Sequence, residues 1–309
     1  MKQKTRKYTA EAIRSDWVRH KWLYLMFLPV LLYYICFSYI PIYGLQVAFK
    51  DYNLGLGISG SPWAGLKHFA AFFRGPFFGR TFTNTIALSL YTILICFPAP
   101  ILFALLLNEV RGSMFKRTLQ TVSYLPHFIS LVVICGIIKD FTKADGLINN
   151  IIAFCGGVPT TMLTKPENFR RIYVISELWQ TIGWNSIIYL TALSGVDPTL
   201  YDAAAIDGAG RLKRVLTITI PCIMPTIIIM FILRIGQFMS VGYEKILLLY
   251  NSNIYETADV ISTFVYRKGL LESNFSFSAA VGLFNSVINF VLVVSVNKIS
   301  SRLSETSLW

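Results

Sequence analysis

Between two long apolar segments the chain contains the sequence Val196-Asp-Pro-Thr-Leu-Tyr-Asp-Ala-Ala-Ala-Ile-Asp-Gly-Ala-Gly210. Asp197-Pro198 predicts a helix start, because aspartate caps a first turn and proline fits into it. Leu200–Ile206 predicts a short alanine-rich helix, and Asp207-Gly208 predicts its end and a turn. A second helix is expected from Gly210 into the next apolar segment. Such a helical hairpin with small residues on one face suits docking to a partner, although a connector without a partner would have the same local features.

Composition identifies the environment of this loop. The chain has 309 residues, of which 54% are hydrophobic and 14% charged, and its mean hydropathy is +0.56. A soluble domain has about 45–50% apolar and about 25% charged residues. Disorder, a collagen-like fibre and a small disulfide scaffold are excluded. The sequence therefore predicts an integral membrane protein.

The net charge of +12 has a topological explanation. Basic residues flank the apolar runs and are not interleaved with aromatic residues on a polar face. In a membrane protein this pattern sets orientation and favours contact with anionic lipid, and it argues against a nucleic-acid partner.

Six segments have the roughly 20 residues that a membrane-crossing helix needs. The sequence therefore predicts an all-α membrane protein with six transmembrane helices: Trp22–Ile40 (closed by Pro41), Thr85–Leu107, Val122–Ile138, Tyr173–Leu193, Pro221–Tyr243 and Ser278–Val296.

Orientation follows from the distribution of lysine and arginine. Fifteen of the 28 lie in short segments on one side, and twelve are spread over three longer loops on the other. Both termini are therefore expected in the cytoplasm. The predicted parts are a basic cytoplasmic segment (1–21), a first transmembrane segment (22–49), a core (80–297), a cytoplasmic tail (298–309), and external loops at Gln46–Asn84, Lys139–Ile172 and Glu244–Phe277.

The sequence contains no pattern for catalysis or for binding a metal. The five cysteines are scattered without a CxxC pair, so they are interpreted as small buried hydrophobic residues. The phosphate-binding motif GxxxxGK[ST] does not occur, and His20, His68 and His127 are far apart in the sequence. We expect no catalytic residue, metal or cofactor in this chain.

The loop sequence resembles the EAA loop of binding-protein-dependent ABC importer permeases. That pattern is Glu-Ala-Ala, three residues, Gly, nine residues and Ile-x-Leu-Pro. Here Asp202-Ala203-Ala204 is followed by Gly208, Ile218 and Ile220-Pro221 at the same spacing, with Asp for Glu and Ile for Leu. The motif lies within 196–221 and occurs in the predicted cytoplasmic context.

Two further segments are similar to one subgroup of this family. Pro41-Ile-Tyr-Gly-Leu-Gln-Val-Ala-Phe-Lys-Asp-Tyr52 and Thr306-Ser-Leu-Trp309 resemble the polysaccharide-type, LplB-like permeases of the MalF-like branch. The resemblance implies a type I ABC importer permease fold and transport of oligosaccharides across a bacterial plasma membrane.

The resemblance also implies a set of partners. These are a second permease subunit, expected to be a paralogue, two cytoplasmic ATPase subunits that hold ATP and magnesium, and an extracytoplasmic solute-binding protein. The helix at about Pro198–Ile206 would be the coupling helix that sits in a cleft of an ATPase. The coupling residues implied by the motif are Tyr201, Asp202, Ala203, Ala204, Asp207 and Gly208.

Polar residues inside apolar spans indicate a possible substrate path, because such groups are costly in a membrane. At 1.5 Å per residue, groups on three spans lie about 18–24 Å from the cytoplasmic side. The candidate path residues are Gln180, Trp184, Asn185, Arg234, Gln237 and Asn285. An alternative is that Arg234 pairs with Glu177 and that the amides join helices together.

Other functions remain open at this point. An ion-coupled secondary transporter would need an acidic relay in its spans, for which Glu177 alone is poor support. A receptor or scaffold would not need the EAA spacing. Within the ABC importers, a solute other than a sugar is also possible.

Overall fold

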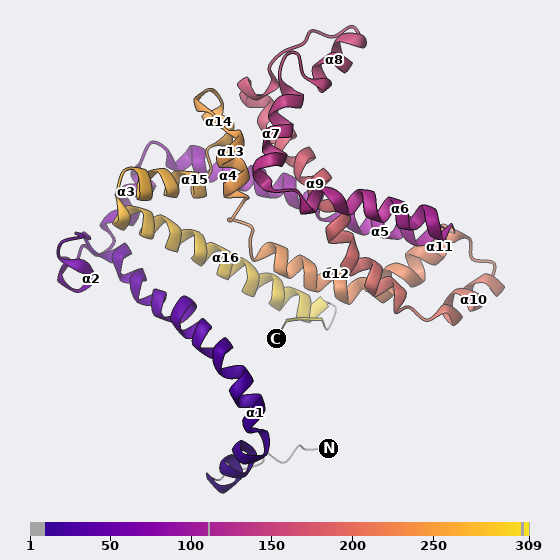
Figure 1. Ribbon diagram of the computed structural model, residues 1–309, viewed down its shortest axis with the longest axis horizontal. Helices are drawn as coiled ribbons and strands as arrows, with labels where there is room; N and C mark the ends of the chain where they lie inside the picture. Colours follow the sequence, from indigo (N-terminus) through magenta and orange to yellow (C-terminus); the bar gives the residue numbers. More distant parts are fainter. Residues whose placement is uncertain (1–9, 111, 304–305, 309) are drawn as a thin grey trace.

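The computed structural model describes residues 10–110, 112–303 and 306–308, and these are almost entirely helical (Figure 1). The only β-pairing in the described ranges is one antiparallel bridge between Lys50 and Trp63. The α-helices are α1 (Ala10–Tyr34), α2 (Gly57–Gly60), α3 (Lys67–Arg74), α4 (Phe78–Cys96), α5 (Pro98–Glu109), α6 (Ser113–Tyr124), α7 (Leu131–Thr142), α8 (Leu147–Phe154), α9 (Pro166–Ser194), α10 (Pro198–Ile206), α11 (Arg211–Arg214), α12 (Ile220–Ile235), α13 (Tyr243–Leu249), α14 (Tyr255–Ala258), α15 (Ile261–Tyr266) and α16 (Phe275–Leu303).

Seven short π- or 3₁₀-helical segments join these helices. They are η1 (Ile35–Tyr39), η2 (Ile40–Phe49), η3 (Leu125–Phe128), η4 (Met162–Thr164), η5 (Val215–Thr219), η6 (Ser252–Ile254) and η7 (Arg267–Leu271). η1, η5 and η7 are π-helical. η5 joins α11 to α12, so that residues Arg211–Ile235 form one continuous helical rod.

The number of membrane-crossing helices is confirmed only in part. By length and composition, four helical runs within the described residues could cross a membrane: Arg19–Phe49, Phe78–Glu109, Arg211–Ile235 and Phe275–Arg302. The bent pair Ser113–Phe128 and Leu131–Phe154 would make a fifth. The predicted span Tyr173–Leu193 lies in the 29-residue α9, which is not one of these apolar runs.

The first helix extends beyond its predicted end. Pro41 does not terminate it, because the chain passes from α1 through η1 into η2 and remains helical to Phe49. Proline lacks only its own N–H and is tolerated in the first turn of a new helical segment. None of the apolar side chains in this run is buried in its central window, and the helix leaves the body at an angle (Figure 1). The predicted basic segment 1–21 lies outside the described residues up to position 9 and belongs to α1 from Ala10 onward.

The predicted span Val122–Ile138 is not one continuous helix. α6 is followed by η3, and the chain then turns by 100° into α7. Pro126 lacks a backbone N–H, so the α-helical bonding of α6 does not continue through it and the chain passes into η3. The extended residues Ile129 and Ser130 then make the turn. Ser130 starts α7 by accepting a hydrogen bond at Oγ from the Val133 N–H at 3.4 Å.

Three other predicted boundaries differ from the structure. The second span begins at Phe78 rather than Thr85, and it continues through Pro98 to Glu109. The fifth ends at Ile235 rather than Tyr243, where Gly236–Gly242 leave the helix. The sixth runs from Phe275 to Leu303, so residues 298–303 of the predicted cytoplasmic tail continue α16. The Leu308 N–H returns to Asn297 Oδ1 at 2.8 Å.

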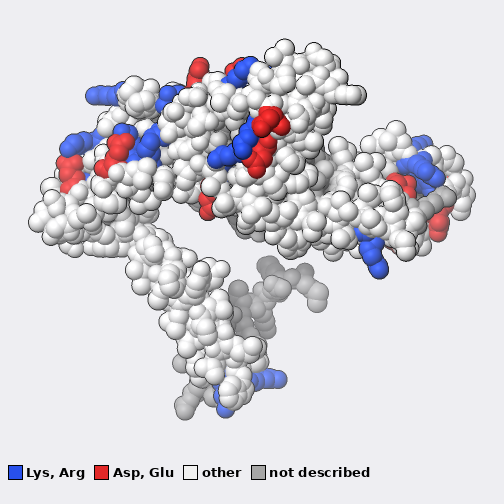
Figure 2. Space-filling view, turned by 45° about the horizontal axis from the view of Figure 1, so that its top comes forward, with Lys and Arg blue, Asp and Glu red and all other residues white. Residues whose placement is uncertain are grey.

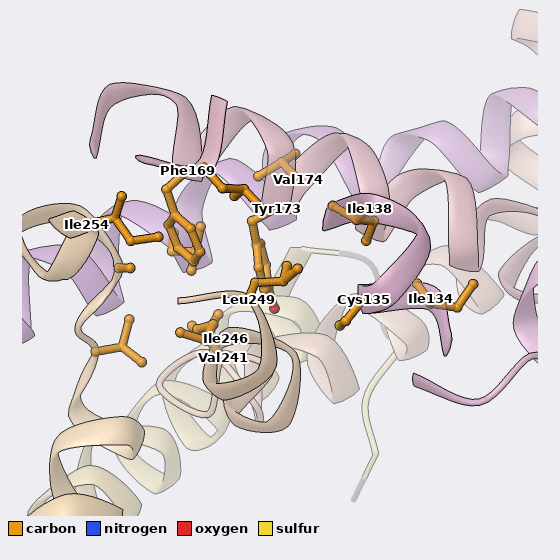
Figure 3. Close-up of a cluster of buried hydrophobic side chains, with 14 of the residues drawn as sticks. Ile134, Cys135, Ile138, Phe169, Tyr173, Val174, Val241, Ile246, Leu249 and Ile254 are labelled. Carbon is orange, nitrogen blue, oxygen red and sulfur yellow. The ribbon is translucent and has the colours of Figure 1, made fainter. Parts of the chain in front are cut away.

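The largest buried cluster lies where α7, α9 and α13 meet (Figure 3). Phe169 and Tyr173 of α9 pack near Ile246 and Leu249 of α13, and all four are at most 2% exposed. α13 belongs to the stretch Glu244–Phe277 that the sequence predicts as an external loop. Its apolar residues fold it into helices, because burying each large side chain gains about 1.5–3 kcal/mol.

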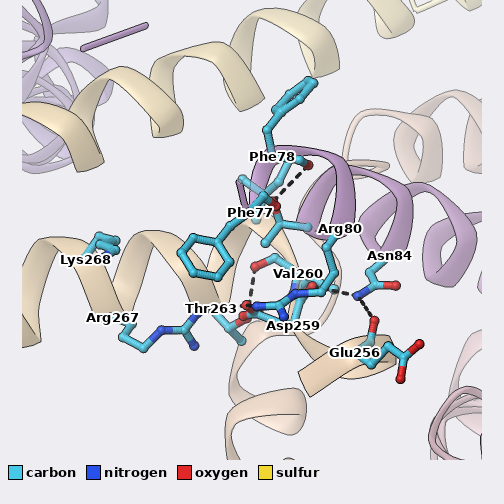
Figure 4. Close-up of polar contacts among 12 residues, drawn as sticks. Phe77, Phe78, Arg80, Asn84, Glu256, Asp259, Val260, Thr263, Arg267 and Lys268 are labelled. Carbon is cyan, nitrogen blue, oxygen red and sulfur yellow. Dashed lines mark hydrogen bonds and ion pairs between the residues drawn. The ribbon is translucent and has the colours of Figure 1, made fainter. Parts of the chain in front are cut away.

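A buried carboxylate fastens this helical stretch to α4 (Figure 4). Asp259 is fully buried and pairs with Arg267 at 2.8 Å and with Arg80 of α4 at 3.2 Å. Asn84 donates from Nδ2 to the backbone oxygens of Glu256 and Asp259. Two guanidinium groups thus neutralise a carboxylate that would be costly to bury alone.

Gly183 allows α9 to cross closely over the end of α6, and alanine at this position should destabilise the protein. A Cβ at Gly183 would lie 2.2 Å from the Ser123 backbone oxygen, so Gly183→Ala must push the helices apart. We expect a cost of about 1–3 kcal/mol, typical of overpacking. Thermal unfolding of the detergent-solubilised protein measures it. Gly282→Ala of α16 is the control, because no described residue outside its own stretch of helix has an atom within 4 Å of a Cβ there. Equal melting temperatures for the two variants would contradict this account.

Candidate functional site

Three adjoining cavities, of about 210, 150 and 530 Å³, lie along α9. Glu177 of α9 lines all three. Arg234 and Gln237 line the first two, and the unwound residues Ser240–Gly242 line the second and third. The cavities therefore form one polar region between α4, α5, α9 and the end of α12.

Five of the six candidate path residues line this region. Asn185, Arg234 and Gln237 line the cavity of about 210 Å³, and Gln180 and Asn285 line the largest one, of about 530 Å³. Trp184 does not line any of the three cavities. Its ring lies outside them, stacked on His127 with centroids 4.4 Å apart and planes 7° apart. The structure thus brings the five polar candidates together at these cavities and leaves out the aromatic candidate, Trp184.

The wall of the cavities includes a stretch of backbone that is not helical. After Ile235 the chain unwinds, and asparagines of α16 bind the freed groups: Asn289 Oδ1 accepts from the Met239 N–H at 2.8 Å, and Asn285 Nδ2 donates to the Met239 oxygen at 3.2 Å. Ser89 of α4 donates to the Phe238 oxygen. Irregular backbone at membrane depth is tolerated where protein or a cavity satisfies it. Asn285 therefore also has the helix-joining role that the sequence left open, and Asn289 and Ser89 were missed.

Glu177 forms an ion pair that the sequence did not predict. Its Oε2 lies 2.9 Å from Nζ of Lys245, whose side chain is 3% exposed. The same ammonium lies 5.2 Å from the centre of the Tyr173 ring. The alternative pairing of Glu177 with Arg234 is wrong, since no ion pair joins them among the described residues. Lys245 was missed because it falls in the predicted external loop, where nothing local marks it as buried.

The predicted coupling loop has the local structure expected from its sequence. α10 spans Pro198–Ile206, and Asp197 caps it by accepting a hydrogen bond from the Thr199 N–H at 2.9 Å. That backbone hydrogen bond lowers the pKa of the Asp197 carboxyl below its ordinary value. Gly208 has φ +72°, a conformation that side chains other than glycine disfavour, and it ends the helix as predicted.

α10 projects from one end of the molecule, and charged side chains gather at that end (Figures 1 and 2). Asp202, Ala203, Asp207 and Gly208 are exposed, and Ala204 is half-buried. Tyr201 instead turns back, with its hydroxyl 3.0 Å from Oγ1 of Thr219 in η5. This contact connects α10 to the rod formed by α11, η5 and α12, and the Tyr201 side chain does not face outward.

Two apolar side chains beside the motif are unusually exposed. Ile206 at the end of α10 is 88% exposed, and Leu212 of α11 is 73% exposed. Ile206 is the last residue of α10, whereas Leu212 lies at the start of the apolar run Arg211–Ile235. The sequence analysis did not name these two residues as contact candidates. For Ile206 a signal was available, since a large apolar residue stands directly before the Asp207-Gly208 turn.

Within the parts of the chain that the structure describes, no group of three or more His, Cys, Asp or Glu side chains could hold a metal. Cys96 and Cys135 are buried, while Cys36, Cys155 and Cys222 are exposed, so the prediction of buried cysteines is correct for two of five.

Comparisons with known proteins agree on one family. The family described as "Binding-protein-dependent transport system inner membrane component" matches residues 69–305. The polygalacturonan/rhamnogalacturonan transport system permease protein YteP of Bacillus subtilis is 42% identical over 94% of this chain and 91% of its own length. Protein LplB of the same organism is also 42% identical, over 94% of this chain and 92% of its own length.

A solved structure has the same fold. In the crystal structure of a bacterial ABC transporter that imports the acidic polysaccharide alginate, one chain superimposes with a TM-score of 0.88 at 41% identity. The match covers 94% of this chain and 99% of that one. A second structure, of the bacterial alginate transporter with an alginate pentasaccharide-bound periplasmic protein, matches with a TM-score of 0.89 at 40% identity over 95% of this chain and 99% of that one.

Proposed function

The chain belongs to the family of binding-protein-dependent transport system inner membrane components, and on that premise we propose that it moves oligosaccharides by alternating access. It is the non-catalytic permease component of an ABC importer for polysaccharides or oligosaccharides, a multi-pass protein with the type I permease fold. The observation that carries the mechanism is the pairing of a polar cavity with an exposed, capped coupling loop in one chain.

α10 is the element through which ATP hydrolysis would act. Its exposed residues Asp202, Ala203, Asp207 and Gly208, together with Ile206, would dock into a cytoplasmic ATPase subunit, one such subunit for each of two permeases. Tyr201 would transmit the movement, because its contact with Thr219 ties α10 to the rod α11–η5–α12. That rod ends at Ile235, and Arg234 in its last turn lines two of the cavities. A pull on α10 would therefore reach the sugar path through one continuous element.

The topology proposed for this mechanism has six crossings with both termini in the cytoplasm of a bacterium. α9 provides the crossing that apolarity alone does not identify, because it is surrounded by other helices and lines the cavities with its polar groups. The bent pair α6–α7 provides another. The second permease subunit, expected to be a paralogue, would close the open side of the cavities, and the binding protein would dock on the external helices α13–α15.

The cavity chemistry suits a sugar. Amide and hydroxyl groups of Thr181, Asn185 and Gln237 line it, and none of these side chains has a hydrogen-bond partner across helices among the described residues. Sugar hydroxyls both donate and accept, so such groups can bind them in several orientations. The isolated Glu177 is neutralised by Lys245 and does not form the acidic relay that a secondary transporter would need.

Uptake by reconstituted vesicles tests this proposal. We expect sugar accumulation that needs ATP, the ATPase subunits and a loaded binding protein together, and that stops when any one is omitted. Radiolabelled oligosaccharides retained inside proteoliposomes provide the measurement, and vesicles with non-hydrolysable ATP analogue are the control. Uptake driven by a proton or sodium gradient without ATP would overturn the proposal.

A further inference from the structure

A fourth cavity, of about 470 Å³, lies between α7, α8, η4 and α9. The residues that α9 contributes to it recur every three or four positions, so they share one face of the helix, and none of them lines the three polar cavities except through its backbone neighbours. They are Asn168, Arg171, Ile172, Ile175, Ser176 and Trp179. We call this cavity the α7–α9 groove. It lies at the part of the molecule from which α8 projects (Figure 1).

The wall of the groove is mainly hydrocarbon. Eight of its twelve lining side chains are large and apolar, and three of the four polar ones already have partners. The hydroxyls of Thr142 and Ser176 donate to carbonyl oxygens of their own helices. Asn168 Nδ2 donates to the Met162 oxygen at 3.3 Å. Because sugar hydroxyls without partners are costly to bury, this wall suits a hydrocarbon chain better than a sugar.

Among the described residues that line the groove, Arg171 is the only charged one. It is exposed, and no ion pair or hydrogen bond joins its side chain to another residue in the part of the chain that the structure describes, including Glu167 one helical turn before it. Residues 139–171 carry five basic and three acidic side chains, and one of the acidic ones, Asp140, is held by Lys143 at 2.6 Å. The end of the groove at Arg171 therefore attracts an anion.

The charged end and the apolar wall follow one another along α9. Trp179 lies eight residues after Arg171, about 12 Å further along the helix. The span expected in α9 begins at Tyr173, so Arg171 lies at its external end and the apolar wall lies beside the outer half of the membrane. α8, which flanks the groove, exposes large apolar side chains, and Phe154 at its end is 93% exposed. Exposed apolar groups on such a helix indicate contact with lipid.

We propose that the α7–α9 groove binds an anionic phospholipid of the outer leaflet, with its phosphate at Arg171 and one acyl chain along the wall towards Trp179. A guanidinium matches two phosphate oxygens at once, and the lipid has its phosphate and its hydrocarbon in the same order as the groove. The surrounding bilayer is as apolar as the groove, so the pairing with phosphate, rather than transfer of the chain, selects the lipid. This inference goes beyond the transport function and rests on the proposed crossing of the membrane by α9.

Native mass spectrometry of the complete transporter, purified in detergent and freed of lipid, tests the site. The probe is dioleoyl-phosphatidylglycerol, and dioleoyl-phosphatidylcholine and glycerophosphate are the comparison ligands. Arg171→Gln removes the cation, and Ile175→Trp fills the groove from an exposed position. The matched controls are Arg74→Gln in α3 and Leu94→Trp in α4, two exposed residues outside the four cavities.

We expect the apparent affinity for phosphatidylglycerol at this site to fall about ten-fold or more in Arg171→Gln, the effect of losing a charge-assisted hydrogen bond. Ile175→Trp should lose the same lipid, and both controls should keep it. Phosphatidylcholine should bind more weakly, and glycerophosphate should not compete. Added phosphatidylglycerol should raise the melting temperature of the unaltered complex more than that of Arg171→Gln, because a ligand that binds only the folded protein stabilises it.

Several results would contradict the inference. Equal retention of phosphatidylglycerol by the unaltered complex and Arg171→Gln would mean that the groove holds no anionic lipid, as when a helix of the second permease covers it. Competition by glycerophosphate would make Arg171 a site for a free anion, and an equal loss of lipid in Arg74→Gln would assign the effect to overall charge. None of these results bears on ATP-driven uptake, so the transport function stands or falls separately.

Discussion

Gly208→Arg is expected to lower ATP-driven uptake at least about ten-fold, equivalent to 1.4 kcal/mol or more of lost coupling. Gly208 has φ +72° and is exposed, and apart from its chain neighbours no described residue has an atom within 4 Å of a Cβ built there. A residue with a side chain is therefore less stable than glycine in this left-handed backbone conformation by about 1–2 kcal/mol. Arginine also adds a bulky cation to the proposed docking surface. The measurement is sugar accumulation in vesicles together with the ATPase rate of the complex.

Two further variants separate the contributions at this loop. Gly208→Ala carries the backbone cost without the bulk and should keep most of the uptake. Asp202→Lys reverses a charge on the exposed side of α10 and should lose uptake, whereas Asp145→Lys, an exposed residue between α7 and α8, should not. If Gly208→Arg and Asp202→Lys both transported normally, α10 would not be the coupling element.

Lys245→Met is expected to destabilise the protein by about 3–5 kcal/mol, the usual cost of leaving a buried ion pair without one partner. Lys245 has 3% of its side chain exposed, and its ammonium contacts both Glu177 and the Tyr173 ring. Loss of the lysine leaves the Glu177 carboxylate beside three cavities without its counter-ion. The melting temperature of the solubilised protein measures the loss.

The double variant Glu177→Gln, Lys245→Met tests whether charge or packing is responsible. Removing both charges should recover a large part of the loss, because a neutral pair of similar size avoids the unpaired carboxylate. A double variant as unstable as Lys245→Met alone would assign the effect to lost packing around the lysine stem instead.

Local features of the chain were predictable because they depend on nearby residues. The start of α10 follows from Asp197-Pro198, and its end follows from Gly208, whose positive φ only glycine adopts easily. The rod from Gly210 into the fifth span was likewise correct. Pro126, just before the break between η3 and α7, was a local signal too, yet the apolar run around it predicted a single span.

Contacts between distant segments were not predictable from these signals. Lys245 lies in a stretch with the composition of an external loop, and only its position beside α9 makes it the partner of Glu177. The aromatic face of Trp184 suits a sugar by its chemistry, but it stacks on His127, which is 57 residues away in the sequence. The position of a residue along one helix predicts its depth in the membrane, but it does not predict which other helix its side chain faces.

The sequence by itself determined the membrane class, the EAA loop with its family, and the presence of polar groups within the spans. These depend on composition, on turn chemistry and on spacing along the chain, which short-range forces set. The tertiary structure decided which of those groups share a cavity, that Lys245 rather than Arg234 neutralises Glu177, and that no described residue forms an ion pair with Arg234. Charge balance in a cavity is a property of several helices at once, and it exists only when long-range packing has brought them together.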